Sequence, residues 1–271
     1  MLGKLLKYDL RASMRKFAPL WLAVLSMSVL TGLVLRATVN SGSDVGFIMK
    51  FLTVLMPFLL FALFIAVAVI FFVFVCQRFY HGLLGNEGYL SMTLPVTVEA
   101  HIASKGLSAL ILSLGTLLVT FLSMFLLLVL VIPVEDVKIG FEQLYRAYQD
   151  MPGWMLAELV LMSVIGSAAG ISMLYAAISL GHLAKRHRVL WSVLAYIGLN
   201  SVLNSLFSFG MAGRLLNRFS LGVFEYSAAP ESDIMTFVGE YWTACLIWAL
   251  VYGTALFFLT RYILKKHLNL E

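Results

Sequence analysis

Long apolar stretches alternate with short charged segments along this chain. A helix rises about 1.5 Å per residue, so about 20 apolar residues cross a hydrocarbon layer about 30 Å thick. No stretch contains Asp, Glu, Lys or Arg, and all but the first, which has 18 residues, reach that length. The stretches are continuous and Leu-rich, which favours helices over the alternating strands of a membrane barrel. The pattern predicts an all-α integral membrane protein with six transmembrane helices, at 18–35, 51–76, 106–134, 159–181, 189–213 and 241–260.

The segment before the first span, 1–16, has the pattern of an amphipathic helix. Apolar residues recur at spacings of three or four up to Phe17, and Lys and Arg occupy the other positions. Such a helix lies in the membrane interface with its basic face toward the headgroups of membrane lipids. Two interpretations stay open, a polybasic topology anchor or an interface helix that also contacts a cytoplasmic partner. The apolar stripe consists of Leu2, Leu5, Leu6, Leu10 and Met14.

The distribution of charge predicts the orientation. Charged residues are 12% of the chain, about half the ~25% of a soluble domain, so few segments lie outside the membrane. With the N-terminus inside, 13 Lys and Arg fall in cytoplasmic segments and 5 in outside segments. Positive residues near span ends resist translocation, so both termini are expected in the cytoplasm, at the cell (cytoplasmic) membrane. The formal charge of +5 is therefore a topology signal, and no nucleic-acid partner is expected.

The segment 77–105 is the largest cytoplasmic feature. Gly82, Gly85 and Gly88 are expected to break the helix that leaves the second span, and Pro95 marks another boundary. A short, partly apolar element lies between them, with no hydrocarbon to enter. Such an exposed element on the cytoplasmic side predicts docking to another protein.

The sequence of that element resembles a known family. Glu87-Gly88-Tyr89-Leu90 followed by Thr93-Leu94-Pro95-Val96, after the second of six spans, is similar to the permease subunits of bacterial ABC exporters of the six-helix, G-subfamily-like (type V) class. The resemblance implies that this segment is a coupling helix that docks on a separate ABC ATP-binding subunit, which carries ATP and Mg. It also implies a second permease, identical or homologous, and a substrate path lined by the second and fifth spans. The residues that the resemblance assigns to ATPase coupling are Glu87, Gly88, Tyr89, Leu90, Thr93, Leu94 and Pro95.

The chain contains no motif of an enzyme. It has no G-x-x-x-x-G-K-[ST] phosphate loop, so it cannot bind ATP in that manner. It also lacks H-E-x-x-H and G-x-S-x-G, and the six spans are expected to hold no acidic residue. His182 and His187 flank a basic turn and make a poor metal site. No catalytic residue, no metal site and no cofactor of its own are therefore expected.

The fifth span carries a polar stripe. Its members recur every four residues, and asparagine amides in hydrocarbon need hydrogen-bond partners. The stripe therefore faces a helix, a cavity or its mate across a dimer axis. Hydrogen bonding between helices and a substrate path both stay open, with Asn200 closer to the first role and Asn204 to the second. The stripe consists of Tyr196, Asn200, Asn204 and Ser208.

The fourth span carries a pattern that concerns helix packing. Gly166 and Gly170 form a G-x-x-x-G face, which predicts tight packing against another helix.

The outside segment 134–153 carries an i, i+3, i+4, i+7 stripe from Phe141 to Tyr148, typical of an interfacial helix. In the outside segment 211–240, Ser232 and Asp233 mark the start of a helix that runs into the sixth span. These outside helices are either gating elements or structured loops.

Together these patterns predict one transmembrane domain, 1–271, that serves as the permease subunit of an ATP-driven exporter. Its substrate is expected to be amphiphilic, such as a peptide, a lipid-like molecule or a drug, because the spans lack charges for ions or sugars. A non-transporting membrane scaffold or sensor that recruits a cytoplasmic partner is the alternative. A secondary transporter is disfavoured because no intramembrane acid is expected.

Overall fold

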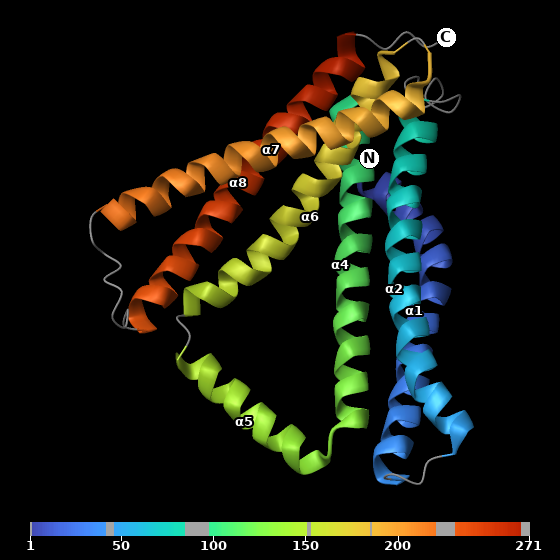
Figure 1. Ribbon diagram of the computed structural model, residues 1–271. Coiled ribbons are helices and arrows are strands. Elements are labelled where there is room, and N and C mark those ends of the chain that lie inside the picture. The colour runs from blue at the N-terminus through green and yellow to red at the C-terminus, as the bar shows by residue number, and fades with distance from the viewer. Residues whose placement is uncertain are drawn as a thin grey trace. The chain divides into compact units, whose positions relative to one another are not determined.

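A computed structural model describes residues 2–41, 46–84, 98–150, 153–184, 186–220 and 231–266. Within these ranges every secondary-structure element is a helix, and six helices are long and apolar enough to cross a membrane (Figure 1). The predicted all-α fold with six spans is therefore confirmed. The elements are α1 (Leu2–Ser41), α2 (Phe47–Phe79), the π-helical turn η1 (Tyr80–Leu84), α4 (Val98–Val131), α5 (Val134–Asp150), α6 (Gly153–His182), α7 (Arg188–Ser220) and α8 (Glu231–Lys266).

The chain divides into two compact units. The first contains Met1–Val75 and Ser108–Pro152, and the second contains Cys76–Leu107 and Gly153–Glu271. Helices α2 and α4 each run through both units. The single transmembrane domain expected from the sequence therefore stays a prediction.

In the first unit, small and polar side chains hold α1 against α2 and α4. The Trp21 indole N–H donates to the Thr116 hydroxyl at 3.2 Å, and the buried Ser28 hydroxyl donates to a main-chain oxygen of α4 at 2.8 Å. Thr38 and Thr53 share a hydrogen bond of 2.8 Å between α1 and α2. Such bonds act between helices in hydrocarbon, where apolar burial supplies no driving force.

The predicted N-terminal amphipathic helix is helical, and it continues into the first span as α1. Phe17 is fully buried and meets the rings of Phe71 and Phe74 edge-on, at centroid distances of 6.1 and 5.2 Å. The buried side of the helix therefore follows Phe17 back to Ser13, which is also fully buried, whereas Met14 is exposed. Met14 was expected on the apolar stripe but is exposed, because packing against α2 determines which side of α1 is buried.

In the second unit, α6 packs against both α7 and α8. A Cβ on Gly253 of α8 would lie 3.0 Å from the Ala169 Cβ of α6, so the two backbones approach closely. A Cβ on Gly166 or Gly170 would meet no atom within 4 Å. Among the described residues the predicted G-x-x-x-G packing is therefore not made, because α6 uses the neighbouring face around Ala169 for α8.

The two helical elements that the sequence predicts on the outer side begin near the expected positions. α5 (Val134–Asp150) is a helix, as the stripe in 134–153 predicted, and Phe141 meets Phe125 of α4 at a centroid distance of 6.0 Å. α8 begins at Glu231 and continues without a break into the sixth span. α7 continues to Ser220, seven residues past the expected end of the fifth span.

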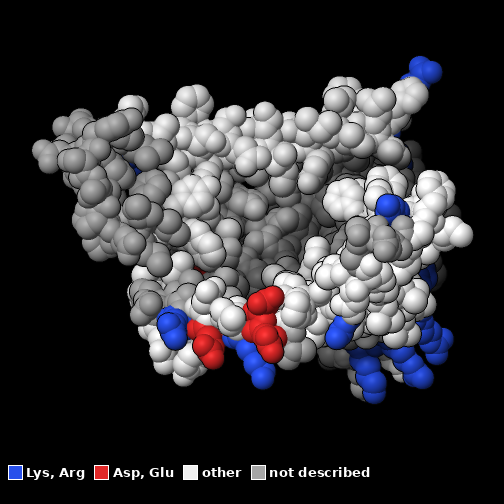
Figure 2. All heavy atoms as spheres, turned by 60° about the horizontal axis from the view of Figure 1, so that its bottom comes forward, with Lys and Arg blue, Asp and Glu red and all other residues white. Residues whose placement is uncertain are grey.

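Apolar side chains cover the outside of the helices. Phe58 of α2, Leu118 of α4 and Phe209 of α7 expose 68%, 68% and 78% of their surface. Figure 2 draws large areas of uncharged side chains, and most of the Lys, Arg, Asp and Glu side chains in this view lie in its lower part. In water this much apolar surface would be unfavourable, whereas hydrocarbon accommodates it.

Candidate functional site: the polar face of α7 and the base of the 85–97 segment

The predicted coupling residues lie outside the described part of the chain, so their structure stays a prediction. The structure describes the two ends of that segment, which are η1 (Tyr80–Leu84) and the start of α4 at Val98. The residues concerned are Glu87, Gly88, Tyr89, Leu90, Thr93, Leu94 and Pro95.

The first end of the segment is the π-helical turn η1. Gly82 was expected to break the helix, yet the chain continues through it as a π turn to Leu84. The Lys105 side chain of α4 lies so close to Gly82 that a Cβ there would collide with its ammonium group. A lysine at the end of a helix interacts favourably with the carbonyl groups there. Gly82 and Lys105 therefore form a clasp between the two ends of the 85–97 segment.

Ring contacts and an ion pair fix the surroundings of this clasp. The Phe79 ring stacks on Tyr175 of α6, with centroids 4.0 Å apart and planes 16° from parallel. Arg261 of α8 pairs with Glu99, in the first turn of α4, at 2.5 Å. His101 of α4 is buried, and among the described residues its Nε2 atom has no hydrogen-bond partner. The base of the segment is thus held by both α6 and α8.

The polar stripe of α7 is present but is not one continuous face. A spacing of four residues advances about 400°, so each step drifts about 40° and three steps drift about 120°. Tyr196 accordingly turns toward α6 and α8, where it packs against Met173, Ala176 and Leu256. Asn200, Asn204 and Ser208 are exposed on another side of the helix.

The two asparagines interact with each other. The Asn204 side-chain amide donates to the Asn200 carbonyl oxygen at 2.9 Å, which uses one donor and one acceptor of the pair. Within the described residues no other hydrogen bond of either amide is found. The residues C-terminal to Asn200 line an open groove of about 460 Å³, formed by Ser201, Asn204, Ser205, Ser208, Phe209 and Ala212.

Sequence reasoning missed one ionisable residue. The fourth span was expected to begin at residue 159, but α6 begins at Gly153 and its apolar span includes Glu158. Glu158 lies about three turns before Ala169, so both residues lie on the face of α6 that packs against α8. Its Oε2 atom is buried and has no hydrogen-bond partner among the described residues. The predicted stretch 159–181 holds no acid, but the helix that carries it extends back past Glu158, and a span edge drawn at the helix start would have included this residue.

The histidines of the α6–α7 turn do not form a metal site in the described structure. The His182 ring lies 3.4 Å from the Arg188 guanidinium and near the Tyr80 ring, and His187 has a positive φ of 57°. Among the described residues, no three side chains of His, Cys, Asp or Glu come together as metal ligands.

The six helices that are long and apolar enough to cross a membrane define a multi-pass α-helical membrane protein. Comparisons with protein-family models, curated proteins and solved structures find no match to the chain.

Proposed function

We propose that this chain is the membrane-spanning permease subunit of an ATP-driven ABC exporter. It lies in the cytoplasmic membrane with both termini inside, pairs with a second permease, and moves an amphiphilic substrate. ATP and Mg bind to a separate ATP-binding subunit, which docks on the segment 85–97.

The observation that carries the proposal is the E-G-Y-L…T-L-P-V sequence between the second and third of six spans. The structure supports a mechanical role for this segment, because the clasp of Gly82 and Lys105 joins its ends. A force applied to the segment therefore reaches α2 and α4 together, and through Phe79 and Glu99 it reaches α6 and α8.

The polar face of α7 supports a second permease. None of the most apolar part of α7 is buried within this chain, and Asn200 and Asn204 are exposed on it. Amide groups in hydrocarbon need partners, which another protein chain or a hydrated path supplies. In the exporter, the groove from Ser201 to Ala212 then lies at the permease–permease interface, beside the substrate path.

Glu158 favours a second candidate function, an ion-coupled transporter. Unpaired acids within spans commonly carry coupling ions or protons. The two functions differ in energy source. Transport that persists without ATP, collapses with an ionophore and is lost in Glu158→Gln supports the second candidate.

Copurification tests the proposed docking. The tagged chain is expressed with a candidate ATP-binding subunit, and the retained ATP-binding subunit is quantified. Leu90→Asp and Glu87→Arg are expected to reduce retention strongly, whereas Arg186→Glu, an exposed charge reversal between α6 and α7, is the matched control. Full retention by both segment variants would exclude docking at 85–97.

Cysteine labelling tests the orientation. In a chain with Cys76 and Cys245 replaced by alanine, a membrane-impermeant reagent should reach cysteines placed at Ser43 and Lys138 from outside. It should not reach cysteines at Gly85 or Lys185. Labelling at Gly85 in intact cells would reverse the topology.

A further inference from the structure

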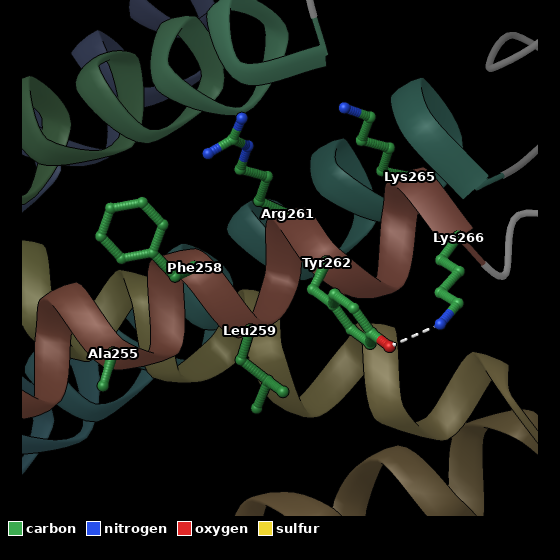
Figure 3. A pocket seen from close by; sticks show the side chains of 7 residues that line it. All are labelled: Ala255, Phe258, Leu259, Arg261, Tyr262, Lys265 and Lys266. Atoms are coloured by element: carbon green, nitrogen blue, oxygen red, sulfur yellow. Dashed lines mark hydrogen bonds between the residues drawn. The ribbon is translucent and has the colours of Figure 1, made fainter.

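An open groove of about 830 Å³ runs along the last turns of α8. Its lining is apolar toward the middle of the helix and basic toward the end. Figure 3 shows Arg261 and Lys265 leaving one side of α8, and Tyr262 and Lys266 the other. The remaining lining residues are Ala255, Phe258 and Leu259.

The three basic side chains of this groove differ in the hydrogen bonds and ion pairs that they already form within the chain. The Lys266 ammonium donates to the Tyr262 hydroxyl at 3.0 Å and lies 5.3 Å from the centre of its ring. Arg261 is paired with Glu99, so most of its charge is already compensated. Within the described residues no hydrogen bond or ion pair of Lys265 is found. Lys265 and the two remaining ammonium protons of Lys266 are the donors left for a ligand.

The part of α8 that lines the groove is about as long as one leaflet of a bilayer is thick. From Ala255 to Lys266 the helix rises about 16 Å, about half the hydrocarbon thickness. The two lysines end the span, where long cationic side chains reach the headgroup layer, and Tyr262 lies in the region where aromatic residues gather. The apolar part at Phe258 and Leu259 is then at acyl-chain depth.

We propose that this groove binds an anionic phospholipid. Lys265 and Lys266, on the two sides of the helix end, attract the headgroup phosphate, and an acyl chain lies over Ala255, Phe258 and Leu259. A lipid fits better than a free phosphate because the apolar floor continues directly from the basic end. The proposal does not depend on the exporter function, since it rests only on α8.

Native mass spectrometry of the full chain in detergent tests the proposal. Dioleoyl-phosphatidylglycerol is titrated against the protein, with dioleoyl-phosphatidylcholine in parallel. Each lysine near an anionic headgroup contributes about a fivefold gain in affinity, so Lys265→Gln with Lys266→Gln should weaken phosphatidylglycerol binding about 30-fold. Phosphatidylcholine binding should not change.

Two further variants separate this site from other causes. Arg186→Gln with Arg214→Gln removes two charges at exposed positions away from this groove and from the basic face of α1, and should leave phosphatidylglycerol binding within about threefold. Lys265→Arg with Lys266→Arg keeps the charge and should retain binding, which excludes misfolding as the cause of a loss.

Three outcomes would overturn the proposal. Equal loss in the Arg186 and Arg214 control would mean that binding follows diffuse charge alone. Displacement of the lipid by millimolar inorganic phosphate would assign the site to a free anion. Unchanged phosphatidylglycerol affinity in the double glutamine variant would exclude the groove altogether.

Discussion

Replacing Asn200 and Asn204 with leucine tests whether the polar face of α7 meets a second permease. The two amides form one hydrogen bond of 2.9 Å with each other, so they stay in register on the exposed side of the helix. Leucine keeps a similar volume and a high helix propensity, so the change removes hydrogen-bonding groups without breaking α7.

The expected loss of dimerisation free energy follows from the hydrogen-bond donors and acceptors that Asn200 and Asn204 leave unused. Each chain retains three amide hydrogens and three carbonyl lone pairs, two on Asn204 and one on Asn200, because the bond between the two residues uses one hydrogen and one lone pair. Across a two-fold axis, four amides then face each other. At about 0.6 kcal/mol for each interhelical bond, four bonds contribute about 2.4 kcal/mol. The double variant should therefore weaken dimerisation about 60-fold.

Förster energy transfer between labelled chains in liposomes measures this change as a function of the protein-to-lipid ratio. Thr254→Leu is the matched control, because Thr254 is an exposed polar residue of α8 that bonds only to its own helix backbone. It should leave the dissociation constant within about threefold.

Two results would distinguish the roles of the stripe. A dissociation constant unchanged within threefold, together with altered substrate-stimulated ATPase activity, would assign the asparagines to the substrate path. Unchanged dimerisation, stability and transport would refute both roles.

Three further predictions concern packing. Gly253→Ala should lower the free energy of unfolding by about 1–3 kcal/mol, because its Cβ would meet the α6 backbone, whereas Gly166→Ala has open space and should change it by less than about 1 kcal/mol; SDS-induced unfolding measures both. Ser28→Ala should cost about 1 kcal/mol in the same assay, since it removes a buried hydrogen bond between α1 and α4, and no loss would contradict that contact. Gly82→Val should displace Lys105 and uncouple ATP hydrolysis from transport while the protein still inserts, so coupled transport at the native level would argue against the clasp.

The spans could be predicted because membrane insertion depends on composition over about 20 residues, which the sequence states directly. The ends of the helices were harder to predict, because a membrane helix can continue beyond the hydrocarbon layer. α6 therefore includes Glu158, and α1 includes the amphipathic segment before the first span. A periodic pattern also cannot show which side of a helix finds a neighbour.

The candidate site shows that limit most clearly. A four-residue repeat predicted one polar face on α7, but helical drift turns Tyr196 toward the core and leaves the asparagines outside. Gly82 was taken as a helix breaker, whereas Lys105, from a distant part of the chain, is placed against it across a π turn. Contacts of this kind depend on tertiary packing, which local residue preferences do not encode.

The central claim, that ATP hydrolysis on a partner subunit drives transport through this chain, is tested most directly in proteoliposomes. The chain and the ATP-binding subunit are co-purified and reconstituted, and movement of a fluorescent phospholipid analogue is recorded with ATP and Mg or with a non-hydrolysable ATP analogue. The account predicts transport only with hydrolysable ATP, and its loss when this chain is omitted or carries Leu90→Asp. Transport that proceeds equally with the non-hydrolysable analogue, or a stable complex that hydrolyses ATP without moving any amphiphile, would contradict it.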